Sequence, residues 1–250
     1  MKIVLLGYGN VAAHLVHAFQ AHPQTEVVQI FSRSSVNEEG LPPVTNDLNQ
    51  LKEADVYIIA ISDNAIKEFS RSLPLQGQLV VHTSGSVSIK SLSAKNRRGI
   101  FYPLQTFSRG RSVDFSTVPI CIEAVQDGDQ QLLMELAGFI SENVVAIDSK
   151  QRRTLHLAAV YVNNFTNHLY QVSEEILAQR DLDFSLLRPL ILETAGKMES
   201  LPPGEAQTGP AVRKDDKTIK KHLKLLRNKQ HKNIYKVLTK SIQRNHGKKL

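Results

Sequence analysis

The sequence has 250 residues and a formal net charge of +7, with 41% hydrophobic and 22% charged residues, a composition that excludes a disordered chain and indicates a globular protein. Its longest apolar runs, such as VYIIAI and LHLAAVYV, fall far short of the ~20 residues that cross a bilayer, so we expect no membrane segment and no membrane partner. The single cysteine, Cys121, excludes an internal disulfide and fits a cytoplasmic location.

The first 149 residues alternate short runs rich in valine and isoleucine with segments of helical spacing. Strands are expected at residues 2–6, 27–31, 56–61, 79–82 and 118–124, and residues 99–104 and 143–148 add strands toward one edge. Helices are expected at residues 10–21, 47–53, 64–72 and 128–141. This alternation predicts an α/β fold with a doubly wound, mainly parallel sheet of the Rossmann type.

From residue 150 no further strand pattern appears, and the apolar spacing is helical to the end of the chain. One long helix is expected over residues 151–180 and a second over 184–200, with Pro189 tolerable in its first turns. After a Pro/Gly-rich break, Asp at the start of DDKTIKKHLKLL is a candidate N-cap, and a last helix covers residues 232–245. The predicted domains are residues 1–149, binding a dinucleotide, and residues 150–250, an all-helical second domain.

The stretch GYGNVA places two glycines and a small residue between the first strand and the first helix. Gly7 permits a tight turn, Gly9 lets a pyrophosphate approach the backbone, and Ala12 lets helix and strand pack closely. The helix N-terminus then offers free N–H groups to phosphates. A purely structural turn is the alternative. The predicted cofactor-binding residues of this turn are Gly7, Tyr8, Gly9, Asn10, Val11 and Ala12.

The second predicted strand ends in IFSRSS, which decides between the two nicotinamide cofactors. An acidic residue here hydrogen-bonds a ribose 2′-OH, whereas Arg accommodates a 2′-phosphate. Ser32, Arg33 and Ser34 supply one cation and two hydroxyls, and no carboxylate follows until Glu38. NADP(H) is therefore the predicted cofactor, although an exposed loop Arg is common.

The next two strands end in side chains that the edge of such a sheet presents to ligands. Ile61, Ser62 and Asp63 follow one strand, and His82, Thr83 and Ser84 end the other; all are predicted to line the site, with Ser84 near the reacting end. Alternatively, Asp63 caps the helix that begins near Asn64, and the hydroxyls of HTSGS bond the loop backbone.

On the long helix, Arg152, His156, Asn163 and Asn164 lie close to one face by α-helical spacing. His156 is the predicted proton-transfer residue, and a core histidine is the alternative. Farther on, Arg213 in TGPAVRKDD presents a fork suited to a carboxylate or phosphate, and Asp215 orients it or caps a helix. No metal site is predicted.

The basic residues gather in the last segment. Residues 213–250 hold 14 Lys/Arg against 2 Asp, whereas residues 1–212 hold 17 against 22 Asp/Glu. Polyanion binding is one explanation of this asymmetry. Because no reader motif is present and few aromatic residues are interleaved, we expect a solvated helix face and no nucleic-acid partner.

In order along the chain, GYGNVA, FSRS, HTSGS, YPLQTF, LHLAAVYVNN and TGPAVRKDD resemble a family of Rossmann-like proteins with a C-terminal helical domain of unknown function, provisionally described as NADP oxidoreductases. These proteins are similar to pyrroline-5-carboxylate reductase and to the 6-phosphogluconate and β-hydroxyacid dehydrogenases. The resemblance implies a helical second domain, often dimeric. The family commonly has His where this chain has Tyr102, which is a poor base at neutral pH.

The resulting hypothesis is an NADP(H)-dependent oxidoreductase acting on a small anionic substrate between the domains, with a homodimer formed through the helical domain. The alternative is a catalytically silent NADP-binding sensor or regulatory protein. The candidate catalytic residues are His156, Asn163 and Ser84, and the candidate substrate-binding residues are Tyr102, Asn164, Arg213 and Asp215.

Overall fold

The computed structural model describes residues 1–36 and 38–246. The chain forms two compact units, Met1–Asn163 and the part from Asn164 onward. The domain boundary predicted between residues 149 and 150 lies in the first turn of helix α4 (Ser149–Ala159), and this whole helix belongs to the first unit.

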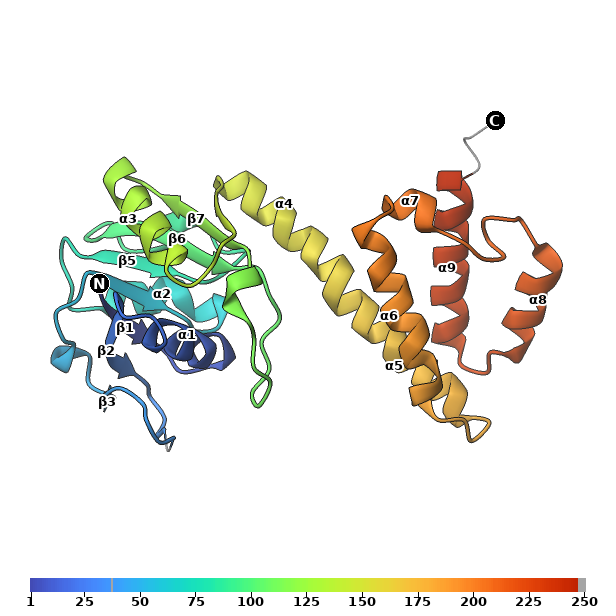
Figure 1. The fold of residues 1–250 in the computed structure, drawn as a ribbon, viewed down its shortest axis with the longest axis horizontal. Helices are drawn as coiled ribbons and strands as arrows, with labels where there is room; N and C mark the ends of the chain where they lie inside the picture. Colours follow the sequence, from blue (N-terminus) through green and yellow to red (C-terminus); the bar gives the residue numbers. More distant parts are fainter. Residues whose placement is uncertain (37, 247–250) are drawn as a thin grey trace. The chain divides into compact units, whose positions relative to one another are not determined.

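The first unit is built on one eight-stranded sheet (Figure 1), in the order β3-β2-β1-β4-β5-β6-β7-β8. Neighbouring strands are parallel except for the antiparallel pair β6 and β7. The strands are β1 (Lys2–Leu6), β2 (Glu26–Phe31), β3 (Val44–Thr45), β4 (Val56–Ile59), β5 (Leu79–His82), β6 (Arg97–Pro103), β7 (Ile120–Ala124) and β8 (Val144–Ala146). The predicted doubly wound sheet is therefore confirmed; the two-residue β3 was not anticipated.

Alternate residues of each strand pack into two separate cores because successive side chains point to opposite faces. Ile3 and Leu5 of β1 join the core formed with α1 (Asn10–Gln20) and α3 (Asp127–Gly138). Val4 and Leu6 join the core on the other face, under α2 (Ile66–Ser72). Both faces are thus covered, as a mainly parallel sheet requires.

Helix α4 covers the part of the second face that α2 does not reach. Its residue Leu155 packs beside Tyr102 and Cys121, which are paired across β6 and β7. The helix begins with a capping box, in which Asp148 accepts bonds from the backbone N–H groups of Lys150 and Gln151. This start fixes where the chain leaves the sheet.

Two predicted helices differ from expectation. Residues 47–53 form only a short 3-10 turn, Leu48–Gln50, because the Gln29 side chain bonds Gln50 O and Lys52 N and holds the segment extended beside β2. The long helix is interrupted by π-helical residues Val160–Phe165, after which α5 (Thr166–Ala178) continues. The boundary between the two compact units falls inside this π-helical segment.

The second unit is helical in its described part, as predicted. After α5 the helices are α6 (Arg188–Gly196), α7 (Pro203–Ala206), α8 (Asp216–Leu225) and α9 (Lys229–His246), with short 3-10 turns at Phe184–Leu187 and Lys197–Glu199. Pro189 lies in the first turn of α6, as expected. His231 Nε2 of α9 lies 3.2 Å from Glu175 Oε2 of α5. None of the helices in the described chain is long and apolar enough to span a membrane.

The two glycines after β1 meet different surroundings. Gly7 has a φ of +104°, and a Cβ there would lie 2.4 Å from Ile61 Cγ2 and 2.7 Å from Ala60 O. Its N–H also donates to Phe31 O at 2.8 Å. Gly9, the N-cap of α1, has a φ of −91°, and a Cβ there would meet nothing within 4 Å. The fold therefore requires glycine at position 7 and not at position 9.

We expect Gly7→Ala to lower the free energy of unfolding by more than about 2 kcal/mol, because it adds both backbone strain and a clash with Ala60 and Ile61, which follow β4. Gly9→Ala should cost about 1 kcal/mol or less, the loss of a favourable N-cap. Urea denaturation followed by circular dichroism measures both. Equal losses for the two variants would contradict this account of the turn.

Candidate functional site

A pocket of about 990 Å³ lies in the first unit over the glycine turn, where the strand order reverses between β1 and β4. Ligands of open α/β sheets bind at this kind of switch point. The pocket is bordered by the ends of β1, β2, β4 and β5 and by one face of α2. Its lining residues are Gly7, Tyr8, Gly9, Asn10, Val11, Phe31, Ser32, Arg33, Ser34, Ser35, Val36, Glu38, Ala60, Ile61, Ser62, Ala65, Glu68, Phe69, Ser72, Thr83 and Arg109.

Most of the residues predicted to bind a cofactor line this pocket, and three do not. Ala12 is fully buried in the core between α1 and the sheet. Asp63 is not a helix cap, since Ser62 is the N-cap residue there; its Oδ2 accepts instead from Ser86 Oγ at 2.5 Å. His82 is completely enclosed, and its Nδ1 accepts from Ser84 N–H at 3.1 Å.

The acidic residues around the pocket have partners, whereas its arginines have no carboxylate partner among the described residues. Glu38 accepts from Tyr8 Oη at 2.8 Å and lies 3.4 Å from His17, and Glu68 pairs with Arg71 at 3.3 Å. Burial, followed by this hydrogen bond to Glu38, raises the pKa of Tyr8 to about 12, so its hydroxyl stays a donor. The two lining guanidinium groups, Arg33 and Arg109, have no carboxylate partner among the described residues. This arrangement of charges favours an anionic ligand.

The loop after β5 is held by its own hydroxyl and imidazole groups. Ser84 Oγ accepts from the N–H groups of Ser86 and Val87, both at 3.1 Å, so the alternative reading of HTSGS as a backbone-bonded loop is confirmed for Ser84. Burial first, and then the charge of Arg152, lowers the pKa of His82 to about 4, so its ring stays neutral. Thr83 is the residue of this loop that lines the pocket.

Arg152 ties α4 to the same loop. Its guanidinium is fully buried and donates from Nη1 to Ser84 O, Gly85 O and Val87 O at 3.0, 3.1 and 2.8 Å. Its Nη2 pairs with Glu123 of β7 at 3.2 Å. Breaking a buried pair of this kind typically costs ~3–5 kcal/mol, since it leaves a charge without compensation. The first turns of α4 are therefore fixed against the sheet.

One turn after Arg152, His156 meets Tyr102 of β6. Tyr102 Oη lies 3.1 Å from His156 Nδ1. A Cβ at Gly85 would lie 2.5 Å from His156 Nδ1 and 2.7 Å from Tyr102 Cζ, so the loop passes directly against both rings. Burial raises the pKa of Tyr102 to about 12, which keeps its hydroxyl protonated. Nδ1 of His156 is engaged, and Nε2 has no partner in the described structure.

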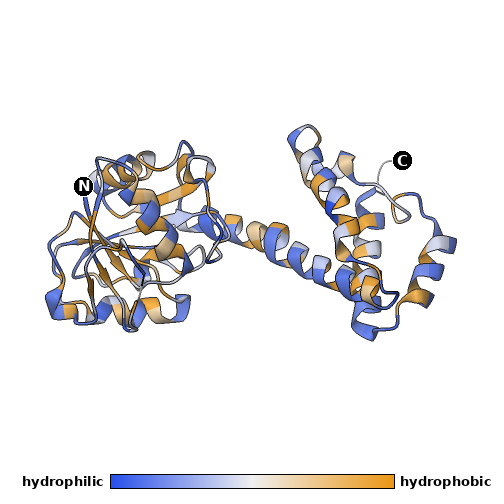
Figure 2. Ribbon diagram, turned by 60° about the horizontal axis from the view of Figure 1, so that its bottom comes forward, coloured by the Kyte–Doolittle hydropathy of each residue, from blue (hydrophilic) through white to orange (hydrophobic). Residues whose placement is uncertain are grey.

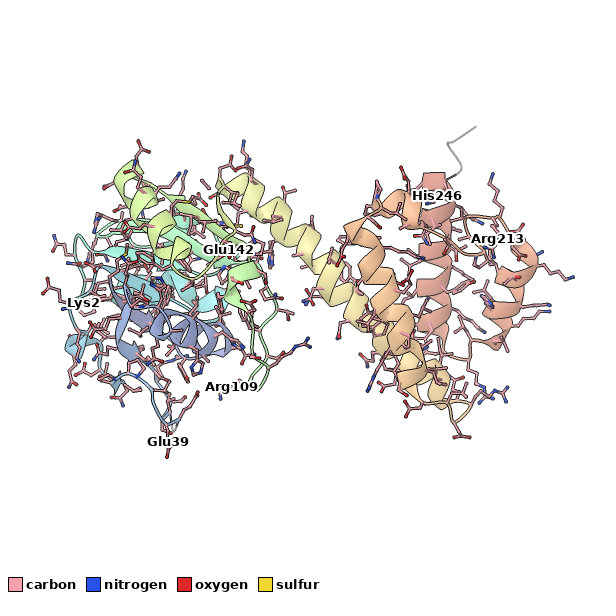
Figure 3. The ribbon with its side chains drawn as sticks, in the orientation of Figure 1. Lys2, Glu39, Arg109, Glu142, Arg213 and His246 are labelled. Atoms are coloured by element: carbon pink, nitrogen blue, oxygen red, sulfur yellow. The ribbon has the colours of Figure 1, made fainter. Side chains whose placement is uncertain are left out.

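The remaining predicted residues lie farther along the chain (Figure 3 labels Arg213). Asn163 and Asn164 are exposed in the π-helical segment, so the α-helical spacing that put them on the face of His156 does not hold through it. Arg213 and Asp215 belong to the second unit. Asp215 caps α8 by accepting from Thr218 N–H at 3.0 Å, which lowers its pKa.

Some lining residues were missed by sequence reasoning. Ala65, Glu68, Phe69 and Ser72 follow helical spacing on one face of α2, a signal that was available once the strand before them was assigned. Arg109 had no such signal, since it lies on a loop after β6, far along the chain from the glycine turn. The part of the chain described here holds no cluster of three or more His, Cys, Asp or Glu that could bind a metal.

Comparison with known proteins adds the following relationships. A crystal structure from Bacteroides fragilis, named provisionally as an NADP oxidoreductase, is 37% identical, with 97% of this chain and 98% of that chain covered and a TM-score of 0.87. A Thermotoga maritima protein is 19% identical, with 98% of both chains covered and a TM-score of 0.74. The pyrroline carboxylate reductase of Plasmodium falciparum, solved with NADP bound, is 13% identical, with 98% of both chains covered and a TM-score of 0.61.

Among curated proteins, none matches this chain. The family model described as a domain of unknown function, DUF2520, matches residues 118–242, which is half of the chain. The Bacteroides fragilis relative is similar over almost its full length. The chain therefore belongs to the DUF2520 family.

Proposed function

We propose that this chain is an NADP(H)-dependent oxidoreductase that transfers a hydride to or from a small anionic substrate. The observation that carries the proposal is the pocket over the glycine turn, open above Gly9 and lined by guanidinium groups without carboxylate partners. The names of the Bacteroides fragilis and Plasmodium falciparum proteins support the same cofactor class.

The residues around the pocket fit a dinucleotide phosphate. The packing of the protein does not require glycine at position 9, whereas a phosphate close to the backbone would, since a side chain there would occupy its place. The N–H groups at the start of α1 would bind the pyrophosphate. Arg33, exposed after β2, would bind the 2′-phosphate. Ser34 would assist, while Ser32 is buried and already donates to Ser34 O at 2.9 Å.

We expect the native protein to bind NADPH more tightly than NADH in calorimetry. Arg33→Gln should weaken NADPH roughly tenfold and leave NADH unchanged, because only NADPH carries the 2′-phosphate. Lys67→Gln is the matched control, since Lys67 is exposed on α2 and does not line the pocket. Equal affinity of the native protein for both cofactors would refute the assignment to NADP(H).

The proposed proton-transfer group is His156. The cofactor, when bound, supplies the hydride. Tyr102, protonated at all ordinary pH values, fixes the His156 ring through Nδ1 and leaves Nε2 free to exchange a proton with the substrate oxygen or nitrogen. Thr83, at the end of the pocket, lies two residues before Gly85, which contacts this pair. Ser84 supports the loop in this proposal. Asn163 is kept as a catalytic candidate and Asn164 and Arg213 as substrate-binding candidates, whereas Asp215 caps α8.

We expect His156→Gln to lower turnover by ~10²–10⁴-fold while leaving NADPH affinity unchanged, because the residue moves a proton and does not hold the cofactor. Tyr102→Phe should lower turnover by a smaller factor, since it removes only the hydrogen bond that orients the His156 ring. The assay follows NADPH absorbance with a panel of small oxo- and imino-acids. His168→Gln, an exposed histidine of α5, is the control.

Unchanged turnover in His156→Gln would remove this residue from the mechanism. A native protein that binds NADPH tightly and turns over none of the panel would instead favour the sensor function. The replacement of the histidine common in the family by Tyr102 is the feature that favours this second function.

The proposed assembly is a homodimer through the helices. Large apolar side chains are exposed along them, and Figure 2 shows apolar residues recurring on the helices of the second unit. Val162 is 76% exposed and Leu192 is 72% exposed. Because soluble monomers rarely expose large contiguous apolar patches, the recurrence of such residues along these helices supports a second copy packed on them. The exposed large apolar residues of the second unit include Phe165, Ile176, Leu182, Leu186, Leu190, Met198 and Leu201.

Light scattering should give about twice the chain mass of 27.9 kDa for the native protein. Leu192→Asp should shift it toward the monomer, because a carboxylate in an apolar interface must be desolvated. Val125→Asp, at an exposed apolar residue of the first unit, should leave the mass unchanged. A native mass of one chain at micromolar concentration would rule the dimer out.

A further inference from the structure

The loop after β6 lies across the start of α1 and is fastened to it at three points. We call residues 105–111 the strap. Asn10 Nδ2 donates to Phe107 O at 3.0 Å, and the His14 ring contacts the Phe107 ring at a centroid distance of 5.0 Å. His14 Nε2 lies 2.9 Å from Arg111 O. The strap is thus held directly beside the glycine turn.

The strap places Arg109 on that turn. Arg109 Nη2 donates to Tyr8 O at 3.3 Å, and its guanidinium carbon lies 6.0 Å from the centre of the Tyr8 ring. Figure 3 labels Arg109 on this loop. The side chain is exposed and lines the pocket together with Gly7 and Gly9. Its remaining donors have no partner among the residues that the structure describes.

The two arginines that line the pocket without a carboxylate partner belong to different parts of the chain. Arg33 follows β2, where the adenosine ribose of a dinucleotide lies in this fold. Arg109 contacts the residue between the two glycines, where the backbone N–H groups of the helix start are found. Arg presents a planar fork that binds phosphate oxygens in pairs. The location of Arg109 therefore favours binding to the pyrophosphate rather than to the 2′-phosphate.

We propose that Arg109 binds the pyrophosphate of the dinucleotide, with the strap serving to deliver it to the glycine turn. The inference rests on the proposed NADP(H) function and adds to it a binding residue outside the glycine motif. The two cations then have separable tasks. Arg33 distinguishes NADP(H) from NAD(H), whereas Arg109 contributes equally to the binding of both, because both carry the pyrophosphate.

Calorimetric titration of the full chain with NADPH and with NADH tests this assignment. Arg109→Gln should weaken both cofactors by the same factor, roughly tenfold, and so preserve the native preference. Arg109→Lys should recover part of the loss, since a point charge remains. Arg111→Gln is the matched control, because Arg111 lies in the same strap but does not line the pocket. This variant should bind both cofactors with the affinity of the native chain.

Loss confined to NADPH would overturn the proposal and assign Arg109 to the 2′-phosphate. Unchanged affinities for both cofactors would overturn it as well. Equal losses of cofactor affinity in Arg109→Gln and Arg109→Lys, together with a lower thermal midpoint of both variants, would also overturn the proposal. The Arg109 side chain would then only hold the strap in place. A native protein that binds neither cofactor contradicts the proposed function itself, whatever the variants do.

Discussion

The buried guanidinium of Arg152 is the interaction on which the arrangement of the candidate site depends. It joins three elements that are far apart in the chain: the loop after β5, through three carbonyl oxygens; β7, through Glu123; and α4, from which it projects. A charge buried so completely is stable only where every donor is satisfied. This requirement fixes both the loop and the first turns of α4, and the position of His156 one turn later follows from it.

The same constraint explains why the loop contains Gly85. Because Arg152 pulls the loop carbonyls toward α4, the backbone passes so close to Tyr102 and His156 that a Cβ would overlap them. Ser84 and His82 complete the loop by accepting backbone N–H groups. The side chains of His82 and Ser84 thus bond mainly to the loop backbone here, whereas Nε2 of the half-buried His156 has no partner in the described structure.

Some residues of the pocket are required by the fold, and others are available to a ligand. Gly7 is required because the turn passes against Ala60 and Ile61 just after β4, whereas no protein atom lies within 4 Å of a Cβ at Gly9. The carboxylates Glu38 and Glu68 have partners, while Arg33 and Arg109 have no carboxylate partner among the described residues. Positive charge without a compensating carboxylate, beside the N–H groups at a helix start, favours an anionic ligand.

The sequence by itself determined the mainly parallel sheet and most of the pocket, because strand alternation and turn motifs are local signals in the chain, as at Gly7, Gly9 and Arg33. Only the tertiary structure decided that His82 is enclosed, that the helix after His156 becomes π-helical, and that Arg152 is a buried clamp. It also decided that Arg109 reaches Tyr8. These facts depend on contacts between residues dozens of positions apart, and helical or strand periodicity carries no information about which distant backbone a side chain will meet.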